Sequence, residues 1–106
     1  MAFDAFKTSG VINAATVATG AAAPTLLVTA GQQALIITID NSGNQPLQIF
    51  LNRATPPVGA ATPDMIVLAG RTKTMSLRNV GRNVQPTIYG RFTAAATGTL
   101  AVNLVL

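Results

Sequence analysis

The chain has 106 residues, which is enough for one domain with a single hydrophobic core and too few for two. With 49% apolar and only 9% charged residues, and a net charge of +4, it is neither a disordered chain nor a typical soluble domain, in which about 25% of residues are charged. Because cysteine and histidine are both absent, disulfides, thiol nucleophiles, imidazole bases and most transition-metal sites are excluded.

Residues 1–24 are predicted to form an extended N-terminal arm. They are rich in alanine and threonine, glycine or proline interrupts them at three positions, and only Val11, Ile12 and Val17 are typical strand residues. Such a segment has little with which to build a core of its own, so we expect it to become ordered only against a neighbouring molecule. Its candidate interaction residues are Phe3, Phe6, Val11 and Ile12.

The N-terminal stretch MAFDAFKTSG does not resemble a secretory signal peptide, because it contains Asp4 and lacks a positive region before an apolar core. No run in the chain approaches the roughly 18 apolar residues that a transmembrane helix needs. We therefore expect a protein that does not bind a membrane, and that acts where it is made or leaves the cell inside a larger particle.

Residues 25–106 are predicted to form a single antiparallel β-sandwich. The nine glycines recur at intervals of 8 to 16 residues, a spacing typical of turns between short strands. Between them apolar and polar residues alternate with the period of two that marks a half-buried strand, as in Leu35–Asp40 and Leu100–Leu106. The expected fold class is therefore all-β, and both a jelly-roll and an immunoglobulin-like strand order are compatible with the pattern.

The stretch NSGNQP, residues 41–46, separates two predicted strands and is rich in groups that could bind a ligand. A similar order of Ala-Gly, strand, Asn-x-Gly, Asn and Gln-Pro recurs in residues 69–86, either from a duplication or from shared hairpin chemistry. Asn and Gly favour the backbone conformations of tight turns, and proline fixes the entry to the next strand. We interpret residues 41–46 as a turn rather than a binding site.

Residues 53–64, RATPPVGAATPD, are predicted to form a long, stiff loop. The Pro56-Pro57 pair excludes a helix and a central strand. Because a loop of this length in a small domain is usually functional or mobile, Pro56 and Pro57 are candidate recognition residues.

Alternation also places apolar side chains on the outer faces of predicted strands, namely Leu27, Ile36, Phe50 and Val105. Together they could form a contiguous patch that another subunit covers, with Ile36 and Phe50 among the contacts. With few charges to protect strand edges, an isolated monomer would also be prone to edge-to-edge pairing. Both points favour an assembled state; the alternative is that some of these side chains are internal.

The basic residues are concentrated in one segment. Arg71, Lys73, Arg78, Arg82 and Arg91 fall within 21 residues that contain no acid. They are either solvated strand and loop positions or a cationic patch that faces an anionic partner.

Nucleic-acid binding is not favoured by this segment. Aromatic side chains beside arginine on a sheet face bind single strands by stacking, and Tyr89 and Phe92 flank Arg91 in this way. Alternation, however, places Phe92 on the core side, which leaves Tyr89 as the one exposed aromatic. We interpret Tyr89 as an edge or interface residue.

No catalytic arrangement is evident. The acids Asp4, Asp40 and Asp64 are isolated along the chain, and there is no phosphate-binding glycine loop, calcium loop or zinc-ligand spacing. We expect a protein that is not an enzyme and that holds no metal or cofactor.

Three stretches carry a resemblance that covers most of the chain. They are FKTSGVINAATVAT, the segment AGQQALIITIDNSGNQPLQIFL, and the ending ATGTLAVNLVL. In style, with no diagnostic motif, the chain resembles small β-sandwich virion proteins of tailed bacteriophages, such as head decoration or cement proteins. The resemblance assigns no functional residue.

The resemblance implies a structural assembly protein of the virion, made in the host cytoplasm without a signal peptide. It implies a homo-oligomer, often a trimer, that binds the major capsid protein or another virion protein and reinforces the lattice. Two alternatives remain open, a carbohydrate- or receptor-binding module on a fibre or appendage, and a basic β-domain that binds single-stranded nucleic acid.

Overall fold

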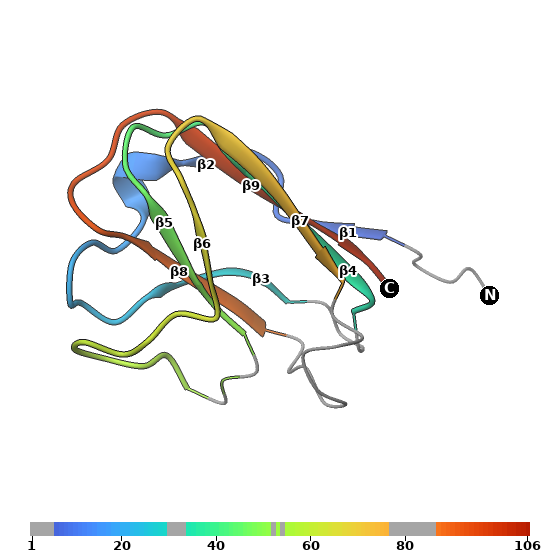
Figure 1. Cartoon of the computed structure of the whole chain (residues 1–106), viewed down its shortest axis with the longest axis horizontal. Coiled ribbons are helices and arrows are strands. Elements are labelled where there is room, and N and C mark those ends of the chain that lie inside the picture. The colour runs from blue at the N-terminus through green and yellow to red at the C-terminus, as the bar shows by residue number, and fades with distance from the viewer. Residues whose placement is uncertain (1–5, 30–33, 52, 54, 77–86) are drawn as a thin grey trace.

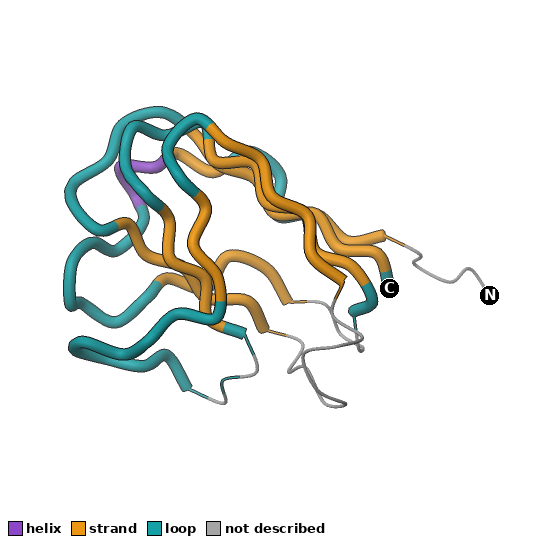
Figure 2. The backbone as a smooth tube through the Cα atoms, in the orientation of Figure 1, coloured by secondary structure: helices purple, strands orange, loops and turns teal. Residues whose placement is uncertain are grey.

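The computed structural model describes residues 6–29, 34–51, 53, 55–76 and 87–106. In this part of the chain almost all regular structure is β-strand (Figure 2). The strands are β1 (Phe6–Thr8), β2 (Ile12–Asn13), β3 (Thr25–Thr29), β4 (Ile36–Asn41), β5 (Leu47–Phe50), β6 (Met65–Val67), β7 (Arg71–Ser76), β8 (Thr87–Phe92) and β9 (Thr99–Val105), and a 3-10 turn, η1 (Ala14–Thr16), follows β2.

The described strands form two sheets that pack face to face (Figure 1). Sheet A has the order β1-β9-β4-β7, with β2 also paired to β9, and sheet B has the order β3-β8-β5-β6. Every pairing within the sheets is antiparallel. The predicted all-β class and the single antiparallel β-sandwich are confirmed.

The strand order is that of a jelly roll. If β1 and β2 are counted as one bent strand, the chain is a ribbon of antiparallel pairs: β1 and β2 with β9, β3 with β8, β4 with β7, and β5 with β6. Winding this ribbon adds two further contacts, β4 with β9 and β5 with β8. Only β5 and β6 pair as neighbours in the chain, so the loop between them closes the ribbon.

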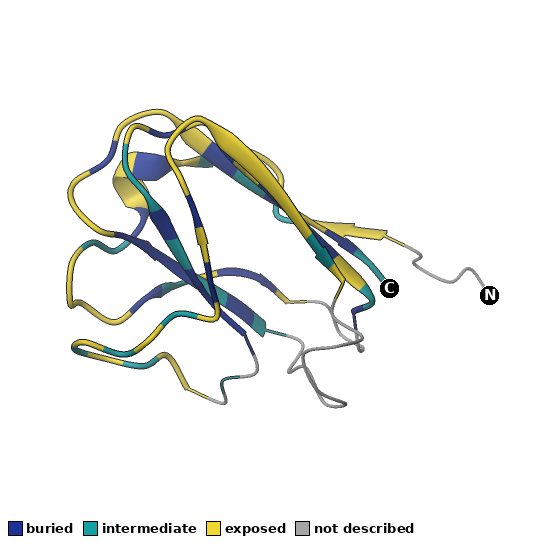
Figure 3. Ribbon diagram, viewed as in Figure 1, coloured by how far each residue is buried: buried dark blue, intermediate teal, exposed yellow. Residues whose placement is uncertain are grey.

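The core lies between the two sheets and follows the predicted alternation. Along β4, for example, Ile37 and Ile39 are fully buried while Ile36 and Asp40 lie on the outer side (Figure 3). Strands β5, β6, β8 and β9 and the residue that follows β5 contribute Leu47, Ile49, Leu51, Met65, Val67, Ile88, Phe92, Leu100, Val102 and Leu104 to the same core.

Leu27 was expected on an outer face, and this prediction is wrong. A β-bulge between Leu26 and Val28 shifts the register against β8, so that Leu27 and Val28 both reach the core while Leu26 points outward. Leu27 fits there because residue 90 is a glycine: a Cβ atom at that position would lie 2.6 Å from Leu27 Cδ1.

Residues 6–24 are not separate from the sandwich, contrary to the expectation of an arm that orders only against a neighbour. β1 and β2 pair with β9 along one edge of sheet A. Ala14 and Val17 are buried in the core. The backbone of Phe92 then donates to Ala18 O and accepts from Gly20 N, both at 2.9 Å. The sequence pattern missed this because the burial depends on a few small side chains rather than on a long alternating run.

Residues 41–46 form a turn whose polar groups bond within the chain, as predicted. The buried Asn41 side chain donates from Nδ2 to the carbonyl oxygens of Gln45 (2.9 Å) and Val67 (3.0 Å), and its Oδ1 accepts from Gly43 N (3.0 Å). Asn44 Oδ1 accepts from Thr97 N at 2.8 Å. Asn41 therefore ties β4 of sheet A to the end of β6 in sheet B.

Candidate interaction surfaces

The outer face of sheet A is a broad strand surface that no described segment covers. The pairing register identifies its side chains, since residues that lie opposite one another point to the same side. They are Phe6, Thr8, Ile36, Thr38, Asp40, Thr72, Thr74, Ser76, Ala101, Asn103 and Val105. We call this set face A.

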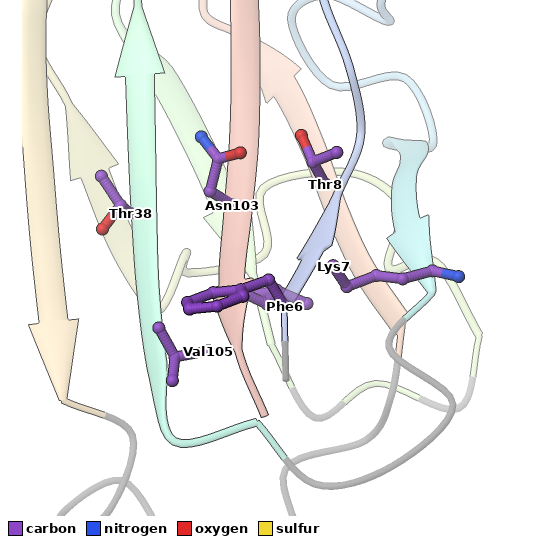
Figure 4. A pocket seen from close by; sticks show the side chains of 7 residues that line it. Phe6, Lys7, Thr8, Thr38, Asn103 and Val105 are labelled. Atoms are coloured by element: carbon purple, nitrogen blue, oxygen red, sulfur yellow. The ribbon is translucent and has the colours of Figure 1, made fainter. Parts of the chain in front are cut away.

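One row of face A is apolar, and two of its members, Phe6 and Val105, line a groove of about 510 Å³. Phe6 lies opposite Val105, which lies opposite Ile36. The Phe6 ring is 74% exposed and lies across β9 beside Val105, whereas Lys7 points away from it (Figure 4). Thr8, Thr38 and Asn103 add hydroxyl and amide groups to the groove, and Lys7 and Leu104 complete its lining.

Face A carries one charged residue among its described side chains, Asp40. Its Oδ1 accepts from the hydroxyls of Ser42 and Thr72, each at 3.3 Å, so neighbouring side chains share this charge. Thr38 and Thr74 bond to each other at 3.1 Å. Face A is thus nearly neutral, with an apolar row at one end and hydroxyl and amide groups beyond it.

Loops of the chain itself cover the outer face of sheet B around Phe50 and Arg91, whereas Leu26 and Ile66 on the same face stay exposed. Arg91, on β8, is only 2% exposed and donates from Nε to Gln48 Oε1 at 3.0 Å. Its Nη1 donates to Ala22 O at 2.9 Å and its Nη2 to Gly59 O at 2.8 Å. The guanidinium also lies 5.0 Å from the centre of the Phe50 ring. Arg91 therefore fastens two loops, around residues 22 and 59, over sheet B.

Two sequence expectations fail on this covered face, which we call face B. Arg91 is not part of an exposed cationic patch, and Phe50 is fully buried rather than exposed. Both were expected outside because alternation reports only which side of a strand a residue is on. The loops that cover face B supply carbonyl acceptors for the arginine, and Gly59 N donates to Ala21 O at 3.0 Å to join the loops to each other.

The stacking platform considered for nucleic acid does not form, because Arg91 is buried and Tyr89 is half-buried. In the predicted recognition loop, Pro56 is exposed and Pro57 is half-buried. Val11 is exposed between β1 and β2, and Ile12 packs partly against the core. Phe3, Arg78 and Arg82, also candidate interaction residues, lie outside the described residues.

Arg71 and Lys73 are exposed on β7, the strand at the far edge of sheet A from β1. A second groove, of about 280 Å³, lies beside them and is also lined by Ile66, Val67, Leu68 and Thr72. Sequence reasoning found the two cations but not the apolar residues next to them. The available signal was the run Met65–Leu68, which has apolar residues at successive positions and therefore on both sides of a strand.

The described acids have structural partners. Asp64 Oδ2 accepts from the backbone N–H of Leu51 at 2.6 Å and lies 3.5 Å from Arg53 Nη2. Among the residues that the structure describes, no three metal-ligating side chains come together. No helix in that same portion of the chain is long and apolar enough to cross a membrane.

Comparison with known proteins finds no match: no protein-family model matches the chain, and no curated protein matches it at a significant level.

Proposed function

We propose that this chain is a non-enzymatic structural protein of a virion, most specifically a capsid decoration or cement protein that stabilises the head by binding neighbouring subunits. The observation that carries the proposal is face A, a nearly neutral strand surface that no described segment covers, in a molecule whose own loops cover Phe50 and Arg91 on face B. The jelly-roll order supports it by analogy alone, since capsid domains share this order with lectins and cupins.

The chemistry of face A suits a protein partner. Its apolar row (Phe6, Val105, Ile36) is followed by a row of uncharged hydrogen-bonding groups. Depletion of charge around an aromatic residue is typical of the centre of a protein interface. Among the described side chains of face A there is no cation for the phosphates of a nucleic acid, and Lys7, at the rim of the groove, is on the opposite side of β1.

The area of face A favours an oligomer on a lattice over an isolated pair. Strand spacing and rise give a four-stranded face of this length about 400 Å², roughly half of the ~800 Å² that each partner contributes to a standard interface. One such contact would be weak. A closed symmetric oligomer, for which a trimer is our first expectation, repeats the contact, and the capsid lattice repeats it again.

The test is density-gradient sedimentation of the particles made by the virus or cell that encodes the chain, with mass spectrometry of the particle fraction. We expect the chain in that fraction at constant stoichiometry. The double substitution Phe6→Ser and Ile36→Ser should remove it. The control Val58→Ser changes a residue that is 71% exposed but lies on the loop between β5 and β6, and it should be retained.

Absence of the wild-type chain from particles would contradict the virion assignment. Retention of the double variant at the wild-type level would remove face A from the binding surface. Native mass spectrometry of the purified chain separates the two kinds of contact, because a self-association that the double variant loses identifies face A as the contact between copies.

A further inference from the structure

The edge of sheet A at β7 pairs with no further strand within the described structure, although the N–H group of Arg71, at its start, already donates to Leu68 O at 3.1 Å. β7 has six residues, Arg71–Ser76, with no proline or glycine among them, and only β4 pairs with it. In an antiparallel ladder, alternate residues of an edge strand direct their N–H and C=O groups away from the sheet. With six residues, β7 is twice as long as β1, the three-residue strand at the opposite edge of sheet A.

The cationic side chains of β7 lie on one side of this edge only. Lys73 lies opposite Ile39, and Arg71 lies opposite the buried Asn41, so both cations leave the sheet on its inner side. There they line the groove beside β6, next to the exposed side chains of Ile66 and Leu68. The edge therefore offers two cations and two apolar side chains to one neighbour.

No described carboxylate compensates the two cations. Asp40 is on the adjacent strand but points to the opposite side, where it bonds with Thr72. Asp64 pairs with Arg53, which is the one ion pair in the described part of the chain. A partner that brings carboxylates to this groove would meet charges of opposite sign without displacing an internal ion pair.

We propose that the β7 edge binds an extended acidic segment of another protein, which adds to sheet A as a further strand with its carboxylates facing Arg71 and Lys73. The inference rests on the proposed function and names the partner's chemistry: an acidic, strand-forming segment of a lattice subunit. Main-chain bonds to β7 give the affinity, and the alternate carboxylates select the sequence.

A second copy of β7 fits this edge less well than an acidic strand. Pairing β7 with itself would bring the cations of both copies to the same groove, where like charges repel one another. A nucleic acid could meet the two cations but has no amide groups with which to extend the sheet.

The test is a titration of the full chain with a synthetic peptide of about eight residues in which glutamate and threonine alternate, a length typical of a strand. Binding is followed by calorimetry, and the amides of β7 are followed by hydrogen exchange. We expect binding together with slowed exchange of alternate amides in Arg71–Ser76. A peptide in which lysine replaces each glutamate should not bind.

The double variant Arg71→Gln and Lys73→Gln should bind the acidic peptide about tenfold more weakly, as expected for the loss of two solvent-exposed ion pairs. Lys7→Gln is the matched control, since it removes an exposed cation from β1 at the opposite edge, and its affinity should stay within about twofold of wild type. A third peptide, with proline at alternate positions, lacks half of the N–H donors and should not bind.

Three results would overturn the inference: no binding of the acidic peptide, equal binding of the lysine peptide, or unchanged binding of the proline peptide. The last would show charge attraction without strand pairing. These outcomes are independent of the proposed function. If the chain binds the peptide but is absent from particles, the β7 site stands and the virion assignment is rejected. If the chain is present in particles but does not bind the peptide, the virion assignment stands and the β7 site is rejected.

Discussion

The outer faces of the two sheets are both made of alternate strand residues, yet the chain treats them in opposite ways. On face B, Arg91 and the loops around residues 22 and 59 bury the Phe50 ring completely. On face A, the Phe6 ring is 74% exposed. The molecule therefore covers the Phe50 and Arg91 part of sheet B with its own loops, whereas no described loop covers Phe6 on sheet A.

The composition of each face agrees with this difference. Face B pairs an aromatic ring with a guanidinium, a combination that requires acceptors once water is excluded, and the loop carbonyls provide them. Face A is dominated by threonine, serine and asparagine, whose hydroxyl and amide groups can bond either to water or to a partner. The hydroxyl and amide groups of such a face can remain hydrated in the isolated chain.

The largest expected effect on stability comes from Phe50, the buried phenylalanine of face B, which we compare with the exposed Phe6 of face A. Phe50→Ala should lower the free energy of unfolding by about 3–5 kcal/mol, because it leaves a cavity beneath the Arg91 guanidinium. Urea denaturation followed by circular dichroism measures the change. A loss below about 1 kcal/mol would show that face B is not held by this ring and would weaken the comparison.

The second effect concerns the arginine that fastens the loops. Arg91→Met keeps most of the side-chain volume but removes three hydrogen bonds, and should cost about 2–3 kcal/mol of unfolding free energy. Faster hydrogen exchange at the Gly59 amide should accompany it, since that amide bonds to Ala21 O. Arg71→Met is the control on the exposed β7 edge, where a change within about 0.5 kcal/mol is expected.

A smaller effect is expected within face A. Thr38→Val removes the cross-strand bond to Thr74 at 3.1 Å and should cost about 0.5 kcal/mol or less in the monomer, since the hydroxyl of Thr74 remains accessible to water. The substitution should weaken self-association, measured as the fraction of oligomer in native mass spectrometry, more clearly than it lowers the free energy of unfolding. The reverse order would indicate that the hydroxyl rows stabilise the sheet rather than a contact.

The smallest effect on stability is expected for the exposed phenylalanine. Phe6→Ala should change the unfolding free energy by no more than about 0.5 kcal/mol, measured at a concentration where the chain is monomeric. The same variant should weaken self-association in native mass spectrometry. If Phe6→Ala destabilised the monomer as much as Phe50→Ala, the distinction between the two faces would fail.

Much of the sandwich could be predicted because its core follows local periodicity. Ile37, Ile39, Leu100 and Val102 are buried where alternation places them, and residues 41–46 are the expected turn. Leu27 broke the pattern because a bulge changes the side on which a residue points without a mark in the sequence. Strand order was also out of reach, since it depends on pairs such as β1 and β9 at opposite ends of the chain.

The candidate surfaces were less predictable than the fold. Periodicity correctly placed Ile36 outside, and Arg71 and Lys73, which composition had singled out, are exposed on β7. It failed at Arg91 and Phe50, whose burial depends on loops about 30 and 70 residues from Arg91 in the sequence. No local pattern encodes such a contact, because it arises only when the ribbon has wound and the loops have met.

The place of β9 in sheet A has a consequence for biosynthesis. β9 pairs with β1, β2 and β4, yet it is the last of the described strands to be translated. Until it leaves the ribosome, β1 and β2 have no partner in the sheet, and β4 can pair only with β7. The groove at Phe6 and Val105 therefore cannot form before β9 has emerged from the ribosome.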